Sequence, residues 1–285
     1  MRAAGFVLLG VVGLASASCA NVAGLDDFHK RTVSESAATA SEFFALKLQL
    51  IAMKPHIGHM LEYRVIDANN FIQSRGVIKA MTSEDVELFA QRAVPRTNGP
   101  YRLDFYADVN RSGGFDGLGS VVSNDHAWRI EPLVESPEKL RGDDIVTVSF
   151  LHSTTFTNID QYPSGTPKPA QDTGLGARVH VEGLGELLGK TVEVRVLEKR
   201  TRHVVALYRT MKADAPVLDA VVPGCVDLET EYDVDVWADA NGNGQYDVPG
   251  DGADRGWRVT VTSSDKGLDA NVDASAAGMI DLAKP

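Results

Sequence analysis

The chain has 285 residues, of which 24% are charged, and a formal net charge of −11 at neutral pH. A chain this acidic has no positive field to attract a phosphate backbone, so we expect no nucleic-acid partner. Its only cysteines are Cys19 and Cys225. If the first carries a lipid, as argued next, no intramolecular disulfide can form.

Residues 1–18 are predicted to be a secretory signal. The uncharged stretch Ala3–Leu14 is followed by small residues that end at Cys19, which is the order of such a signal. The segment resembles a bacterial lipobox, although Ser16 stands where leucine is usual. The residue after the cysteine is Ala20 and not an aspartate, which resembles the pattern of lipoproteins sent to the outer membrane. We therefore expect lipid on Cys19 and an exported protein anchored in the cell envelope. Ordinary signal cleavage after Ala17 is the alternative.

The rest of the chain is predicted to contain one module written twice. Residues 46–67 align without a gap on residues 177–198, an offset of 131 residues, and a shared Trp-Arg pair closes each copy. Chance similarity of two strands would not preserve both features, so the repeat reflects duplication. The predicted organisation is signal peptide 1–18, lipidated Cys19 and flexible tether 19–40, copy 1 at 41–160, linker 161–175 and copy 2 at 176–285.

Within each copy, apolar residues alternate with period two and turn residues recur often, which predicts strands. We expect an all-β protein with two tandem Ig-like antiparallel β-sandwich domains, each of ~110 residues and seven strands. Asp104, Asp233 and Asp235 fall at outward positions and are predicted to lie on a solvated face. Tyr106 and Trp237 are predicted to cover the outer face of the sheet rather than to bind a sugar.

Each copy has an acidic loop of the pattern DxNx[SN]Gx[FY]D. Oxygen ligands at loop positions 1, 3, 5, 7 and 9, with a glycine at position 6 for the sharp turn, suit calcium. The pattern lacks the glutamate at position 12 of an EF-hand, so we expect modest affinity and a structural role. The alternative is a metal-free Asx-turn hairpin. The predicted ligands are Asp108, Asn110, Ser112, Gly114 and Asp116 in copy 1, and Asp239, Asn241, Asn243, Gln245 and Asp247 in copy 2.

Copy 1 carries histidines that copy 2 lacks. Leu187 replaces His56, Lys190 replaces His59, and Arg255 replaces His126, while copy 2 has no histidine in place of His152. His56, His126 and His152 fall where loops and strand ends of a sandwich can meet. They suit zinc or copper, with Met53, Met60 or Asp125 as a further ligand or supporting partner. Alternatively, they form a neutral hydrogen-bonding cluster that orders loops.

Four short stretches of copy 1 together resemble an uncharacterised secreted bacterial β-sandwich module. They are Pro55–Gly58, Asp108–Asp116, Asp125–Arg129 and His152–Ile159. The resemblance covers most of copy 1 and extends more faintly to copy 2. This resemblance implies a β-sandwich architecture, but it implies no enzymatic reaction.

Motifs for a serine nucleophile, a phosphate-binding loop or a zinc protease are missing from the sequence. The sequence therefore predicts a non-enzymatic envelope lipoprotein, a binding or structural module with calcium-type loops. Its partner, a protein or a glycan, is not identified by any motif. The alternative function is copper or zinc handling, or metal-assisted chemistry, at the histidines of copy 1.

Overall fold

The computed structural model describes residues 42–118, 125–140, 143–161, 168–242, 254–276, 280 and 282. The predicted signal, Cys19 and the tether to residue 40 lie outside these residues. Within them the all-β prediction is confirmed, because every regular element is a strand except two short 3-10 helices, η1 (Lys54–His56) and η2 (Leu184–Leu187). No helix in this part of the chain is long and apolar enough to cross a membrane.

The strands follow the repeat that the sequence predicts. Copy 1 contributes β1 (Phe43–Ile51), β2 (Met60–Ile66), β3 (Ile72–Ile78), β4 (Val86–Pro95), β5 (Arg102–Asp108), β6 (His126–Ile130), β7 (Glu135–Leu140) and β8 (Asp143–Leu151). Copy 2 contributes β9 (Leu175–Glu182), β10 (Val192–Glu198), β11 (Val204–Thr210), β12 (Leu218–Val226), β13 (Glu231–Ala238), β14 (Arg255–Thr262) and β15 (Leu268–Asp273).

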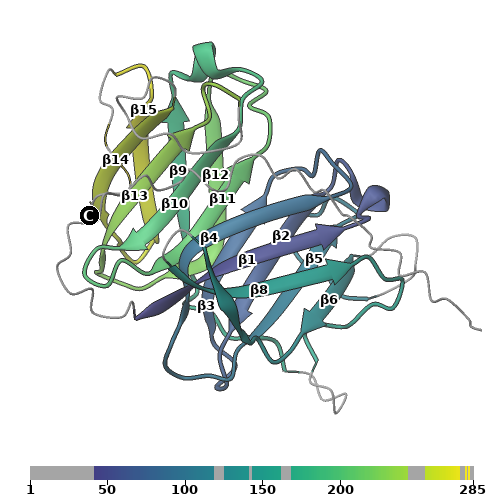
Figure 1. Ribbon diagram of the computed structural model, residues 1–285. Helices are drawn as coiled ribbons and strands as arrows, with labels where there is room; N and C mark the ends of the chain where they lie inside the picture. Colours follow the sequence, from purple (N-terminus) through teal and green to yellow (C-terminus); the bar gives the residue numbers. More distant parts are fainter. Residues whose placement is uncertain are drawn as a thin grey trace, which may run out of the picture.

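The strands form three sheets, one of which is shared by both copies (Figure 1). Copy 1 has a sheet of its own in the order β4-β1-β8-β7, and copy 2 has one in the order β12-β9-β15. The remaining strands form an eight-stranded sheet in the order β14-β13-β10-β11-β3-β2-β5-β6. Each copy therefore pairs its small sheet with one half of the shared sheet.

The strand pairing differs from two separate antiparallel sandwiches. β1 pairs in parallel with β8, and β9 pairs in parallel with β15. The two copies are also joined, because β3 pairs in parallel with β11. Period-two alternation identifies a strand but neither its neighbour nor its direction, so the sequence could not reveal these pairs.

The join between β3 and β11 places the two small sheets on opposite faces of the shared sheet. Gly76 lies opposite Leu207, and Val77 lies opposite Tyr208. Leu207 packs in the core of copy 1, whereas Val77 and Tyr208 pack in the core of copy 2. Successive residues of a strand point to opposite faces, so the two cores lie on opposite sides. A Cβ on Gly76 would overlap the ring of Tyr63, so glycine is needed here.

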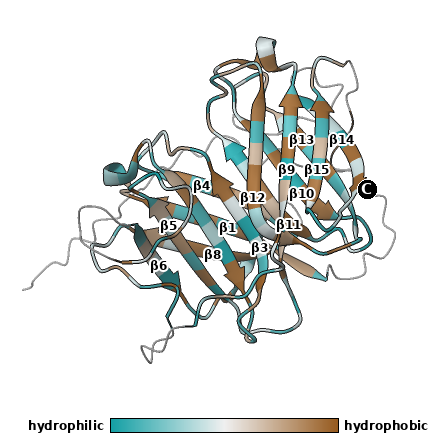
Figure 2. Cartoon of the chain, turned by 180° about the vertical axis from the view of Figure 1, so that it is seen from behind, coloured by the Kyte–Doolittle hydropathy of each residue, from teal (hydrophilic) through white to brown (hydrophobic). Residues whose placement is uncertain are grey.

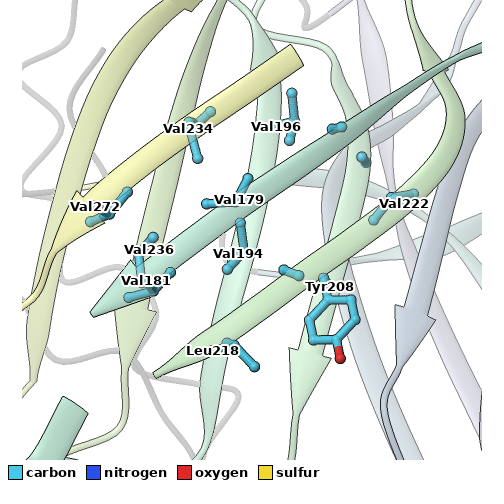
Figure 3. Packing of buried hydrophobic residues seen from close by; sticks show 14 of the residues in the cluster. Val179, Val181, Val194, Val196, Tyr208, Leu218, Val222, Val234, Val236 and Val272 are labelled. Carbon is cyan, nitrogen blue, oxygen red and sulfur yellow. The ribbon is translucent and has the colours of Figure 1, made fainter. Parts of the chain in front are cut away.

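Each copy has its own hydrophobic core, and the alternation of apolar and polar residues that builds it is visible along the strands in Figure 2. In copy 2 valine dominates the buried face, as Figure 3 shows. β-branched side chains of this kind pack well on pleated strands. The core of copy 1 includes larger side chains, among them Tyr63, Phe105 and Trp128.

The outward-facing aspartates are buried, which corrects the prediction of a solvated face. Arg129 donates to both carboxylate oxygens of Asp104 at 2.7 and 2.8 Å, and Arg258 does the same to Asp235 at 2.6 and 2.9 Å. Asp104 is 1% exposed and Asp235 is 2% exposed. Asp233 is also buried and accepts a hydrogen bond from the Thr260 hydroxyl. The sequence showed the outward direction of these side chains but not what covers them.

In copy 1, the chain that follows β8 packs over Asp104 and Arg129. Arg129 also donates to the backbone carbonyls of Ile159 and Gln161, both at 2.9 Å. Tyr106 lies in a buried cluster with Ala127 and Ile159, and its hydroxyl donates to Glu62 at 3.0 Å. The matched pairs Arg129–Asp104 and Arg258–Asp235 show that the two copies repeat individual contacts as well as strands.

Candidate functional site

One end of copy 1 gathers most of the predicted site residues. β1 and β8 end together, with Ile51 opposite Leu151. Met60, at the start of β2, lies opposite Asp108, at the end of β5. The β1–β2 connection, the β5–β6 connection and the chain after β8 therefore leave the sandwich at the same end.

The acidic loop of copy 1 is folded around the carboxylate of Asp108. This carboxylate accepts hydrogen bonds from the backbone N–H groups of Ser112 at 3.0 Å and Gly113 at 2.9 Å. The Asn110 side chain accepts a second bond from Ser112 N–H at 3.0 Å and donates to Asp116 at 2.5 Å. These contacts bring both ends of the loop together.

The bond from Ser112 N–H to Asn110 is that of an Asx turn, in which an Asp or Asn side chain accepts from the backbone two residues ahead. The bonds to Asp108 come from four and five residues ahead, so they enclose a wider turn. The Ser112 hydroxyl donates to the carbonyl of Gly114 at 2.9 Å, so two of the predicted calcium ligands are paired with each other. The loop thus gathers the predicted oxygen donors through hydrogen bonds among its own residues.

Asp125 is a third carboxylate in this loop, and sequence reasoning placed it elsewhere. It was expected to support the histidines, but its carboxylate accepts hydrogen bonds from Val109 N–H at 3.1 Å and Asp116 N–H at 3.2 Å. Burial, together with the nearby carboxylates of Asp116 and Asp108, raises the pKa of Asp125 to about 6. Its side chain therefore belongs to the acidic loop.

The signal that would have identified Asp125 is its counterpart in copy 2. Asp254 precedes Trp257-Arg258 by the same spacing with which Asp125 precedes Trp128-Arg129. Its carboxylate accepts hydrogen bonds from Ala240 N–H and from the indole N–H of Trp237, both at 3.0 Å. A buried aspartate thus supports the start of the loop in both copies.

The loop of copy 2 is described only over its first residues. Asp239 is buried, and its carboxylate accepts a hydrogen bond from Gly242 N–H at 2.7 Å. Asn241 lies in the same turn. The predicted ligands Asn243, Gln245 and Asp247 lie outside the described residues.

The histidines of copy 1 lie together. The ring centroid of His56 is 5.1 Å from that of His126 and 5.1 Å from that of His152. His59, which the sequence prediction did not include in the metal site, is 6.2 Å from His56. The Nε2 atoms of His56 and His152 are 3.1 Å apart. The tertiary structure therefore brings together the three predicted histidines and adds a fourth.

Several nitrogen atoms of this cluster are buried without a hydrogen-bond partner among the described residues. They are Nδ1 of His56, Nδ1 of His59, and both ring nitrogens of His126. Burial, together with His126, His152 and His59, lowers the pKa of His56 to about 4. Burial, followed by His152 and His59, also lowers the pKa of His126. At neutral pH, His56 and His126 are therefore uncharged.

Aromatic rings line the histidine cluster. Trp128 contacts His56 and His152 at centroid distances of 5.5 and 5.8 Å, and Phe156 stacks on His126 at 3.9 Å. The indole N–H of Trp128 donates to the carbonyl of Ser153 at 2.9 Å, which fixes the ring against the end of β8.

Of the two methionines proposed as further ligands, Met53 lies in the core of copy 1. Met60 packs against the cluster of Tyr106, Ala127 and Ile159, which is on the other face of the shared sheet. Met60 thus does not join the histidines. Alternation along β2 explains this, because Met60 and the core residue Leu61 must point to opposite faces.

Within the described part of the chain, no group of three or more His, Cys, Asp or Glu side chains is arranged to hold a metal ion as it stands. The comparisons of the chain with protein families, curated proteins and solved structures found no match. The chemistry of this end of copy 1 is therefore argued from its own residues.

Proposed function

We propose that this protein is a non-enzymatic, lipid-anchored binding or structural module of the cell envelope, whose acidic loops bind calcium. Anchoring is supported by the uncharged stretch Ala3–Leu14 and the small residues before Cys19. The binding role is supported by the shared sheet of the two copies and by the three connections that leave copy 1 at the same end. The proposed partner is an envelope protein or glycan.

The observation that carries the calcium proposal is the meeting of Asp108, Asp116 and Asp125 in one loop. Like charges held close together destabilise one another unless a cation or a proton neutralises them. The raised pKa of Asp125, about 6, has this repulsion among its causes. Calcium would neutralise the three carboxylates and accept oxygen ligands from Asn110 and Gly114 as well.

An Asx turn explains the bond from Ser112 N–H to Asn110, but it leaves the repulsion among the carboxylates in place. The buried carboxylate of Asp125 lies on the loop, and no basic side chain of the described residues is among its hydrogen-bond partners. Calcium therefore explains more of the loop than the turn geometry does. The missing glutamate at loop position 12 makes the proposed site weak, with a dissociation constant of about 10⁻⁴ to 10⁻³ M.

The test is thermal unfolding of the full chain, purified in detergent, with 10 mM calcium as the added probe or with EDTA. At this concentration, one site of the stated affinity stabilises the folded state by about 1.4 to 2.7 kcal/mol. We expect a higher melting temperature with calcium and a smaller rise in Asp108→Asn. The control is Asp269→Asn, an exposed aspartate on β15. An equal rise in both variants, or none in the wild type, would mean that the loops are metal-free hairpins.

A further inference from the structure

Four imidazoles lie together at the end of copy 1 although the chain brings them from distant positions. His56 and His59 flank the turn after η1, His126 begins β6, and His152 follows β8. The backbone N–H of His152 donates to the carbonyl of Ile51 at 2.9 Å, so its position is set by the pairing of β8 with β1. Strand ends, which are rigid, therefore hold His126 and His152.

Copy 2 shows that the fold does not need these histidines. At the corresponding place Leu187 is 2% exposed and packs in the core. Arg255, which replaces His126, forms an ion pair with Glu186 at 2.8 Å. The same module thus closes this end with an apolar side chain and an ion pair, so packing alone does not explain a cluster of imidazoles in copy 1.

The hydrogen bonds of the cluster are also incomplete. If His56 Nε2 carries the proton shared with His152, its Nδ1 is a buried acceptor without a partner, and the other tautomer leaves a buried donor. His126 has no partner at either nitrogen among the described residues. An unmatched buried polar atom destabilises the folded state, and a metal ion bound to His126 would satisfy one of its two unmatched nitrogens.

Three distances in the cluster are close to those between ligands of one tetrahedral ion. Two imidazole nitrogens bound at 2.0–2.1 Å to a tetrahedral zinc ion lie about 3.3 Å apart, and their ring centroids lie about 5 Å apart. The Nε2 atoms of His56 and His152 are 3.1 Å apart, and the His56 centroid is 5.1 Å from those of His126 and His152. His59, at 6.2 Å, lies slightly farther away.

We propose that His56, His59, His126 and His152 form a binding site for one borderline transition-metal ion, of the zinc or copper class. Neutral imidazoles prefer such ions, whereas calcium prefers oxygen. Binding requires the rings to turn about their side-chain bonds, since the cluster as it stands is not arranged to hold a metal ion. The site is separate from the acidic loop, so it goes beyond the proposed calcium function and does not depend on it.

The test uses the full chain, purified in detergent and freed of metal with a chelator, and titrated separately with Zn²⁺ and Cu²⁺. We expect one equivalent of at least one ion to bind and to change the fluorescence of Trp128, which contacts His56 and His152. His56→Leu and His126→Arg copy the residues of copy 2. Because loss of a supporting group alone costs 10- to 100-fold in metal affinity, loss of a ligand should weaken binding by about a hundredfold or more.

The matched control is His180→Ala, because His180 is a half-buried histidine of copy 2 that pairs with Asp219. This variant should bind the ion as the wild type does.

A second measurement needs no variant. In nitrogen NMR spectra of the wild type, Zn²⁺ should shift the imidazole resonances of the four histidines of copy 1 and leave those of His180 and His203 unchanged. Binding of neither ion, undiminished binding in His56→Leu, or unshifted imidazoles would each overturn the proposal. The calcium experiment is independent, since Asp108→Asn should retain the transition-metal site.

Discussion

His203 is the side chain through which the start of β11 contacts copy 1. Its ring stacks on Phe43 at a centroid distance of 4.7 Å, and it is hydrogen-bonded to the backbone of Ala93. The nearby guanidinium of Arg92 lies over the ring of Phe43 and donates to the carbonyl of Thr201 at 2.8 Å. Burial, with a smaller contribution from Arg92, lowers the pKa of His203 to about 4.

This lowered pKa predicts a loss of stability in mild acid. The unfolded chain, with an ordinary pKa of 6.5, binds a proton between pH 6.5 and pH 4 that folded His203 does not. The contribution of His203 is therefore complete above about pH 6.5 and decreases as the pH falls to 4, by about 3 kcal/mol. Denaturant unfolding at pH 7 and pH 4.5 should show a smaller pH dependence in His203→Gln than in the wild type.

The control for this prediction is His180→Gln, because His180 is a half-buried histidine of copy 2 outside the contact with Phe43. The pH dependence should change less in this variant than in His203→Gln. Equal pH dependence in the wild type and in His203→Gln would show that this imidazole titrates normally in the folded chain.

At the scale of elements, the pairing of β3 with β11 makes each copy part of the other's core. Leu207 belongs to β11 of copy 2 but is 1% exposed and packs in the core of copy 1. Val77 of β3 packs in the core of copy 2. At this parallel strand pair, each copy thus contributes a side chain to the hydrophobic core of the other copy.

Leu207→Ala should therefore destabilise copy 1 more than the copy in which the mutation lies. The cavity should cost about 2–5 kcal/mol, and hydrogen exchange should become faster in β2 and β3. Val236→Ala, in the core of copy 2, is the matched variant and should speed exchange in β10 and β13 instead. Faster exchange confined to copy 2 in Leu207→Ala would contradict a shared core.

At the scale of the whole molecule, the two cysteines separate anchoring from folding. Cys19 is the proposed lipid site, whereas Cys225 is buried and its thiol donates to the carbonyl of Val222 at 3.3 Å. Cys19→Ser should move the protein from the membrane fraction to the soluble fraction and abolish labelling by a fatty-acid analogue. Cys225→Ser should stay in the membrane fraction. If both variants stay in the membrane fraction and still carry the fatty-acid label, the lipid is attached to a residue other than Cys19.

Much of the fold could be predicted from local patterns. Alternation along segments such as Leu46–Leu50 and Tyr101–Ala107 predicted strands, and these segments lie within or overlap β1 and β5. The offset of 131 residues predicted equivalent strands, which the structure places at equivalent positions in the two halves of the shared sheet. These signals are local or repeated, so they need no knowledge of which strands meet.

The candidate site was partly predictable for a different reason. The histidines that only copy 1 has could be grouped because copy 2 served as an internal comparison. Their approach to 5.1 Å depends on the pairing of β1 with β8 and of β5 with β6, which no periodicity records. Asp125 was assigned to the histidines because it is next to His126, yet its side chain points to the acidic loop. Asp125 precedes β6, so its place next to His126 in the sequence does not fix the direction of its side chain.

The sequence by itself determined the strand class, the duplication and the residue types available at each loop, because these depend on local alternation and on repetition. Only the tertiary structure decided that the copies share one sheet, that Asp104 and Asp235 are buried as ion pairs, and that four imidazoles meet beside Trp128. Each of these depends on which distant strands pair and on what packs over them. Long-range pairing and burial are properties of the whole fold, so local patterns do not contain them.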